Sequence, residues 1–454
     1  MKRKKQIREI EKMNKPLEKL LKEFDFLEIN ENKLYCKNCN RFINFDMHHG
    51  SRYFVKVHMK SESHQNDYNP IYLDLCELLI ESNIPLNKVN NIKMRSFFEN
   101  HFGFFLQDES NYRKKFLPLI FEKKFSNLKN FIGRNKFLLI IDETTDSKKR
   151  SVVNIIIAPL KNSPLQFFLL STNFLDGVNH QTISQNILNS LNRLFQGEII
   201  YGNLLMILSD QASYMIKSMK KLKIFFPKML HITCLCHSLH LVCEKIRTEY
   251  RLFNSFMKNF KNYFNKSPSR IRDFTEKTNL PQMRYPILTR WGTFLSSCEY
   301  LIGHFTDIKN YFLSLETENQ FASKIKKLVI DSKLFEELTR INDNFLILLS
   351  YIIFFEGNEN TLKEQFLVIK KIKNLLQGTF KDKFIESLSK NPDLEKLMKM
   401  IQNDFIPEFN YVPLTSVEVE RSFSVLKNLL SDRRLNLSEE NIEKQLLIQI
   451  NKDL

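Results

Sequence analysis

Two aspartates each follow an apolar run, a position from which a carboxylate can act in catalysis. Asp142 comes directly after "FLLII" in "KFLLIIDETTDSKKRSVVNIIIAP" (136–159), and Asp210 ends "NLLMILSD" (203–210). Taken singly, each could be an ordinary turn acid. Two carboxylates at adjacent strand ends would instead bind divalent magnesium or manganese. A pair of such ions can stabilise both the attacking and the leaving oxygen of a phosphoryl displacement.

The elements around both aspartates bear on this choice. Apolar runs and helical periodicity predict the order strand (137–141), strand (151–159), strand (165–175), helix (180–195), strand (203–210), helix (212–226) and strand (230–237). That order is typical of the ribonuclease H-like α/β fold, in which the ends of the first and fourth strands lie side by side. Asp142 and Asp210 each stand at one of those ends, so we expect them to be neighbours.

A second group of possible ligands lies near the N-terminus. Cys36-x2-Cys39 and His58-x5-His64 are separated by eighteen residues. Two thiolates and two imidazoles suit a tetrahedral zinc ion, and aromatic residues between the pairs could supply a small core. Two unrelated Cys and His pairs are the alternative. We expect a structural zinc finger over 31–68.

Charge and composition indicate a folded protein with a polyanionic partner. The chain has 454 residues, 43% of them hydrophobic, and a net charge of +17. This charge favours nucleic acid as the partner, although compositional drift in a lysine- and asparagine-rich chain is another source of lysine. The basic opening "MKRKKQIREIEK" has no apolar signal region and fits a nuclear localisation signal, a phosphate-binding arm or a solvated tail. The apolar stretch 345–355 is too short to span a bilayer, so we expect no membrane contact.

Shifts in pattern divide the chain into six expected segments. They are a basic arm (1–30), the zinc finger (31–68), a helical DNA-binding or dimerisation module (69–135), the first part of the α/β core (136–291), a helical insertion (292–405) and the C-terminal part of the core (406–454). A proline-containing basic stretch, 265–291, is expected to be the linker into the insertion. In the helical module, Val89, Ile92, Phe97 and Phe98 are spaced as one apolar face.

With these residues identified, the chain resembles the hAT family of DNA transposases over most of its length. "LLIIDETTDSKKRSVVNIII" and "ILSDQASYM" look like the family's two aspartate motifs, "CLCHSLHLV" like its Cys-x2-His motif and "TRWGTF" like its Arg-Trp motif. "TSVEVERSFSVLKNLLSDRRLNLSEENIEKQLLI" resembles its C-terminal dimerisation region. Residues 30–135 also resemble CGG-repeat-binding protein. The resemblance implies metal-dependent cut-and-paste transposition of double-stranded DNA in the nucleus. The alternative is a domesticated DNA-binding regulator without catalysis.

The resemblance also implies roles for particular residues. Asp142, Asp210 and Glu420 match the three catalytic acids that hold magnesium or manganese, and Glu420 directly precedes Arg421 as the family pattern requires. Glu418 lies about 200° around a helix from Glu420, so the two cannot face the same metals.

Further matches concern the DNA strand. His237 matches the family histidine near the scissile phosphate, and Cys234 its motif partner, with a core histidine and a buried thiol as the alternatives. Trp291, beside Arg290, matches the tryptophan that stacks on a displaced base, although a lone tryptophan can also be a core residue. His240 stands where many relatives have asparagine, which leaves its role open.

The final helix carries an apolar face, formed by Ile442, Leu446, Leu447 and Ile450. It could pack within its own chain or across a subunit interface. The family resemblance favours a homodimer or a larger oligomer through this C-terminal region.

Overall fold

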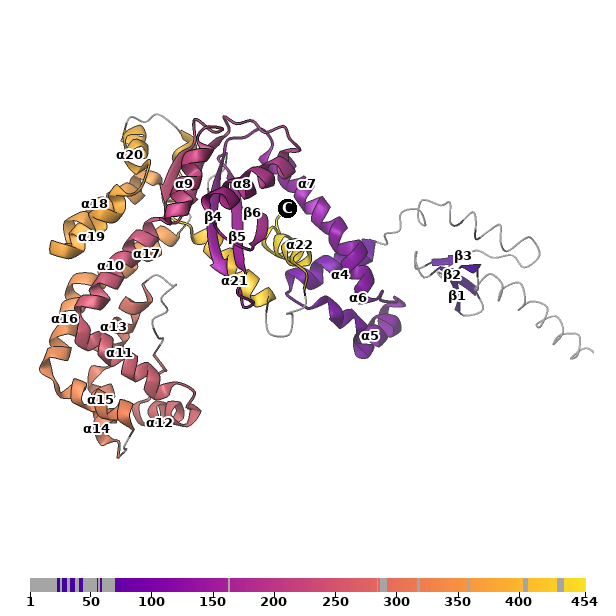
Figure 1. Ribbon diagram of the computed structural model, residues 1–454. Coiled ribbons are helices and arrows are strands. Elements are labelled where there is room, and N and C mark those ends of the chain that lie inside the picture. The colour runs from indigo at the N-terminus through magenta and orange to yellow at the C-terminus, as the bar shows by residue number, and fades with distance from the viewer. Residues whose placement is uncertain are drawn as a thin grey trace, which may run out of the picture. The chain divides into compact units, whose positions relative to one another are not determined.

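A computed structural model (Figure 1) describes residues 23–24, 27–30, 33–36, 41–43, 55, 58, 70–161, 164–283, 285, 292–316, 319–357, 359–402, 407–430 and 437–454. The chain divides into two compact units. The first consists of Met1–Asn130 with Val425–Leu454, and the second of Phe131–Ser424. Both carboxylate motifs of the sequence lie in the second unit.

The first unit contains a small antiparallel sheet. Its strands are β1 (Leu27–Asn30), β2 (Lys33–Cys36) and β3 (Arg41–Ile43), in the order β1-β2-β3. Leu34, Tyr35 and Ile43 are buried, and the ring of Tyr35 meets Phe105 edge-on with 5.9 Å between centroids. Because β1 pairs with β2, the sheet begins within the segment expected to be a basic arm.

Helices make up the rest of the first unit. They are α4 (Pro70–Glu81), η1 (Leu86–Asn90), α5 (Ile92–Phe102), α6 (Glu109–Asn111), η2 (Tyr112–Phe116), α7 (Leu117–Ile132) and α22 (Glu439–Ile450). Tyr72 of α4 stacks on Phe116 with centroids 5.3 Å apart. The apolar face expected around α5 is wrong as a core face. Val89 is buried, but Ile92 is 79% exposed and Phe97 52% exposed.

The final helix packs inside its own chain. Ser438 caps α22 by accepting a hydrogen bond from the Asn441 N–H at 3.3 Å. Ile442, Leu446 and Leu447 are fully buried, and α22 packs against α4. The apolar face that could have served a subunit interface is therefore largely covered within the chain.

The second unit is built on a mixed five-stranded sheet. Its strands are β4 (Phe137–Thr145), β5 (Ser151–Pro159), β6 (Phe168–Leu175), β7 (Leu204–Ser209) and β8 (Leu230–Thr233), in the order β6-β5-β4-β7-β8. β4, β5 and β6 are antiparallel neighbours, whereas β7 runs parallel to β4 and β8 parallel to β7. Most residues of these strands are buried, as expected for strands covered on both faces. The expected strand and helix order is confirmed, and so is the adjacency of the first and fourth strands.

Two helices connect the strands of this sheet. α8 (His180–Phe195) begins at a capping box, in which Asn179 accepts from the N–H of Thr182 and Thr182 accepts from the N–H of Asn179. α9 (Ser213–Leu222) follows β7. The two helices pack against each other, with the hydroxyl oxygens of Ser184 and Ser218 2.8 Å apart.

A large helical region follows β8. It comprises α10 (Leu235–Glu249), α11 (Arg251–Phe264), α12 (Pro268–Thr278), α13 (Thr293–Gly303), α14 (Phe305–Ser314), α15 (Gln320–Ile330), α16 (Ser332–Phe345), α17 (Ile347–Glu356), α18 (Leu362–Leu375), α19 (Gly378–Ser389) and α20 (Leu394–Gln402). η3 (Pro407–Phe409) and α21 (Val417–Leu429) return the chain to the sheet.

This helical region differs from the expected insertion in its limits. α11 packs against α15 and α16, so the helical packing begins well before residue 292. α12 lies inside the stretch expected to be a linker. Among the described residues no single helix has the length and apolar character to cross a membrane. α16 and α17 meet those criteria only as a pair bent by 44°.

Candidate active site

Two parallel strands bring Asp142 and Asp210 together. Ile140 of β4 pairs with Leu208 of β7, so the residues two positions further along each strand direction are Asp142 and Asp210. Asp142 is 5% exposed and its Oδ1 accepts the backbone N–H of Glu143 at 2.8 Å. Asp210 Oδ1 accepts the N–H of Ala212 at 3.1 Å, just before α9 begins. Both carboxylates therefore lie level with each other, Asp210 directly after β7 and Asp142 inside β4, which continues past the expected strand end to Thr145.

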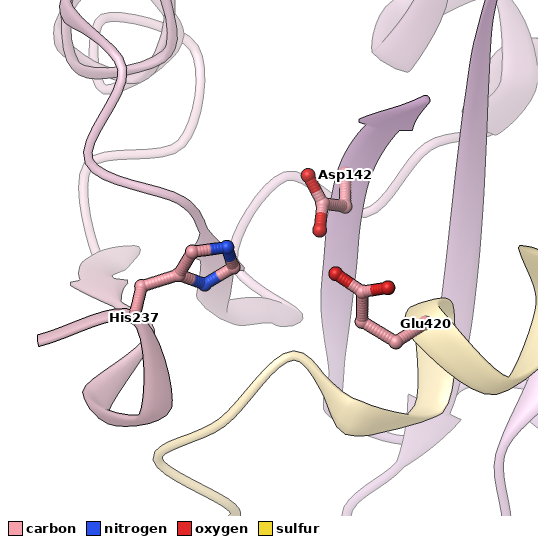
Figure 2. A group of neighbouring side chains, drawn as sticks. All are labelled: Asp142, His237 and Glu420. Carbon is pink, nitrogen blue, oxygen red and sulfur yellow. The ribbon is translucent and has the colours of Figure 1, made fainter. Parts of the chain in front are cut away.

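Two side chains from distant parts of the sequence join Asp142. Ligand atoms of Asp142 on β4, His237 on α10 and Glu420 on α21 lie within 4.8 Å of one another (Figure 2). Asp210 is not a member of this group of three. Its charge nevertheless raises the pKa of both Asp142 and His237, which places Asp210 in the immediate surroundings. We call these four residues the acid cluster.

Backbone contacts at the end of β8 bring α10 and α21 together. The N–H of Cys234 donates to the Ser209 carbonyl at 2.8 Å, which ties the start of α10 to β7. The N–H of Leu235 donates to the Leu414 carbonyl at 2.9 Å, and the N–H of Ser416 donates to the Cys234 sulfur at 3.2 Å. Since His237 lies in the first turn of α10 and Glu420 in the first turn of α21, these bonds fix the two side chains side by side.

A buried asparagine holds α21 from the other side. Asn154 pairs with Asp142 across β4 and β5, and its Nδ2 donates to the Ser422 hydroxyl at 2.7 Å. Ser422 lies two residues beyond Glu420 and donates to the Val419 carbonyl at 2.6 Å. Sequence reasoning missed both residues. The available signal is the one amide inside the apolar strand "SVVNIIIAP", because a buried polar group is retained when it has a bonding role.

Gln211 is a second link that sequence reasoning missed. Its Nε2 lies 3.2 Å from Thr233 Oγ1, 3.1 Å from Ser238 Oγ and 3.1 Å from the Ser387 carbonyl, and its Oε1 accepts the Ser387 hydroxyl at 3.1 Å. The residue directly after Asp210 thus joins β7, β8, α10 and α19.

Burial and mutual repulsion disfavour the charged form of the acids. Burial raises the pKa of Asp142 well above its usual value, the charges of Glu420 and Asp210 raise it further, and the charge of His237 opposes them. Burial also raises the pKa of Asp210 and of Glu420, although His237 again opposes the rise. Carboxylates in this state gain from a nearby cation, because it offsets both desolvation and repulsion.

His237 and Cys234 influence each other's pKa beside the acids. Burial alone would lower the pKa of His237, but the charge and hydrogen bond of Cys234, with the charges of Asp142 and Asp210, raise this pKa to about 10. Burial opposes ionisation of Cys234, yet its hydrogen bonds with Cys236, His237 and Ser416 and the charge of His237 lower its pKa well below the usual value. Each of the two side chains therefore favours the charged form of the other.

The neighbouring acids have separate partners. Asp146 Oδ1 accepts the N–H groups of Lys148 and Arg150 at 2.8 and 2.9 Å, and its Oδ2 lies 2.7 Å from Arg150 Nη2. Asp146 is therefore the acid of the hairpin turn. Glu143 accepts the Tyr214 hydroxyl at 2.9 Å, and Glu418 pairs with Arg421. The three acids of residues 142–146 thus differ in their partners: Asp142 belongs to the acid cluster, Glu143 bonds to Tyr214, and Asp146 bonds within the turn.

Several expected site residues lie outside the described part of the chain. They are Cys39, His64, Arg290 and Trp291. Of the other two expected zinc ligands, Cys36 is buried at the end of β2 and His58 is partly exposed. Zinc binding at these four residues and base stacking by Trp291 stay predictions.

Residues 120–267 match the family described as "Domain of unknown function (DUF659)". This domain is associated with the dimerisation regions of hAT-family transposases, so the match relates the chain to transposases of this type. The matched segment carries Asp142, Asp210 and His237, and Glu420 lies beyond it. No curated protein matches the chain.

Proposed function

We propose that this chain is a cut-and-paste DNA transposase of the hAT type, with a ribonuclease H-like core and metal-dependent strand cleavage and transfer. One observation carries the proposal. Asp142, His237 and Glu420 come from three distant segments, and their ligand atoms lie within 4.8 Å of one another, with Asp210 beside them on β7. A helix-capping or turn acid would not require a histidine and further acids from distant segments beside it.

The acid cluster suits magnesium or manganese. Asp142, Asp210 and Glu420 would hold the ions, because these metals prefer carboxylate oxygens. The raised pKa values of all three acids support this assignment, since each acid gains from a cation at the cluster. When bound, the ions would activate water and stabilise the oxygens of the reacting phosphate.

The remaining roles belong to the side chains themselves. His237, whose protonated form Cys234 favours, would donate a hydrogen bond to an oxygen of the scissile phosphate and stabilise its charge. Asp142 is nearly inaccessible, whereas Asp210, His237 and Glu420 are partly exposed, so a reacting group would approach the cluster from their side. Asn154 and Ser422 keep Glu420 in place through their hydrogen bond.

Recognition of the DNA would rest on other parts of the chain. A zinc finger of Cys36, Cys39, His58 and His64, together with the basic N-terminal arm, would bind the element's double-stranded ends. Arg290 and Trp291 would receive a displaced base. The net charge of +17 supports a nucleic-acid partner. A nuclear location and a homodimer or larger oligomer belong to the same proposal.

A DNA-binding regulator without catalysis is the second candidate. The charge and the zinc finger would serve such a protein equally well, and the matched domain family is described without an activity. The two candidates differ in what they require of the acid cluster. A transposase needs every acid, whereas a regulator tolerates the loss of any of them.

A cleavage assay separates the two candidates. End-labelled DNA from the gene's own flanks is incubated with the full chain and magnesium or manganese. The same DNA is tested with Asp142→Asn and with Asp176→Asn, an exposed acid of the same unit. We expect nicked and hairpin products from the wild type and Asp176→Asn, and none from Asp142→Asn. DNA binding without cleavage by all three proteins would reject the transposase.

A further inference from the structure

One face of α9 carries an aromatic and two basic side chains in line. Tyr214, Lys217 and Lys221 are three and four residues apart, so they fall within about 60° of one another around the helix. Lys217 and Lys221 are both exposed. Neither forms an ion pair with an acid in the part of the chain that the structure describes.

A third basic group lies beside them on α8. Partial burial and then the charges of Lys221 and Lys217 lower the pKa of His180, the first residue of α8. α8 and α9 are held together by packing and by the contact between Ser184 and Ser218. The three groups therefore share one basic strip, whose positive charge is that of the two lysines and which we call the α8–α9 ridge (His180, Lys217 and Lys221).

Tyr214, on the same face of α9 as the two lysines, leads towards the acid cluster. The Tyr214 hydroxyl, in the first turn of α9, donates to Glu143 Oε2 at 2.9 Å, and Glu143 follows Asp142 on β4. Asp210 lies three residues before α9 begins. Lys221 lies about 10 Å further along the helix axis than Tyr214, at 1.5 Å per residue. A strand passing the acids thus meets the ridge within a few nucleotides.

A solvated basic face is the ordinary reading of exposed lysines. It does not explain the pattern here, because like charges one turn apart repel each other and weaken a helix. Lys217 and Lys221 are such a pair, and together they disfavour the charged form of His180. A polyanion that neutralises both lysines would remove this repulsion.

We propose that the α8–α9 ridge binds the phosphate backbone of the DNA strand that enters the acid cluster. The proposal rests on the proposed function, because the bound strand is its substrate. Lysines act as point charges on phosphates and read no base, so the ridge positions the strand without sequence preference. Tyr214 marks the point at which the backbone passes from the ridge to the acids.

Salt dependence of DNA binding tests the ridge. The full-length double variant Lys217→Gln/Lys221→Gln is compared with Lys324→Gln/Lys327→Gln, which removes two exposed lysines of α15 in the same unit. The probe is a labelled DNA duplex from the gene's flanks, without divalent metal. Each phosphate contact adds about 0.9 to the slope of log K against log salt, so the ridge variant should lose about 1.8 from it. The control should match the wild type.

Conservative replacement and catalysis complete the test. Lys217→Arg/Lys221→Arg keeps the charges and should restore the wild-type slope. Since contacts add to the slope, the zinc finger and the basic arm do not mask the loss. A ridge variant whose slope equals that of the control overturns the proposal, and so does a wild type that fails to bind DNA. A wild type that binds but does not cleave rejects the proposed function alone, because the slopes still decide the ridge.

Discussion

Replacement of Asn154 by leucine should separate positioning of Glu420 from stability of the fold. Asn154 is fully buried on β5, donates to Ser422 at 2.7 Å and leaves its Oδ1 without a hydrogen-bond partner among the described residues. Leucine has the same branched arrangement of side-chain heavy atoms and removes that buried, unpaired oxygen. Ser422 keeps its own bond to the Val419 carbonyl. The variant should therefore fold, but it should lack the hydrogen bond that links β5 to α21.

The expected energies follow from these contacts. The lost hydrogen bond contributes about 1 kcal/mol net, and removal of an unpaired buried oxygen recovers a similar amount. Asn154→Leu should thus change the free energy of unfolding by less than about 1.5 kcal/mol. Ser422→Ala is the contrasting change. It leaves the Asn154 amide N–H groups buried without that acceptor, at a cost of about 1–3 kcal/mol. The double variant should cost less than the sum of the two single changes.

The effect on catalysis should be larger than the effect on stability. Residues that orient metal ligands typically contribute 10- to 100-fold to metal affinity or activity. We therefore expect Asn154→Leu to need about 10-fold more magnesium or manganese for half-maximal DNA cleavage. Urea unfolding without metal gives the stability, and a metal titration of the cleavage rate gives the affinity. A variant with a wild-type metal titration would refute the positioning role, whatever its stability.

Three further predictions concern pH, packing and zinc. The folded-state pKa values of Asp142 and Glu420 are raised, so their contribution to stability is present below pH 4 and is lost as pH rises. In chelator at pH 7.5, well above the usual pKa of these acids, Asp142→Asn should melt at a higher temperature than the wild type, and added magnesium should reverse the order. Gly292→Ala should lower the free energy of unfolding by about 2 kcal/mol, because alanine disfavours its φ of +69° and a Cβ would lie 2.8 Å from the Leu349 side chain. Calorimetry would test it, and an unchanged melting curve would contradict it. Elemental analysis should find one zinc per chain, lost in Cys36→Ser. Equal zinc in both proteins would reject the assigned ligand set.

The sheet and its two aspartates could be predicted because their signals are local. Each strand is an apolar run with a clear end, and the order of elements restricts the topology. The adjacency of β4 and β7 then places Asp142 beside Asp210 without any side-chain detail.

The rest of the site depends on long-range packing. Glu420 reaches Asp142 through the Asn154 contact and through the backbone bonds of Leu235 and Ser416, and none of these pairings is visible in a local pattern. Its role was available only from the family resemblance. The limits of the helical region were missed for the same reason, since α11 looks like any amphipathic helix until its packing partners α15 and α16 are known.

The exposed face of α5 shows a further limit of periodicity. Helical spacing of Ile92 and Phe97 predicts a shared apolar face, but it does not tell whether another part of the chain covers that face. In the structure both side chains are exposed.

The most direct test of the central claim compares two glutamates of one helix. Glu420 belongs to the acid cluster, whereas Glu418 pairs with Arg421, and such exposed pairs contribute about 1 kcal/mol or less to stability. Both Glu420→Gln and Glu418→Gln should bind flanking DNA as the wild type does. In magnesium or manganese, Glu418→Gln should cleave it within a few-fold of the wild-type rate, and Glu420→Gln should produce no nicks or hairpins. Equal cleavage by the two variants would contradict the assignment of the acid cluster as the catalytic centre.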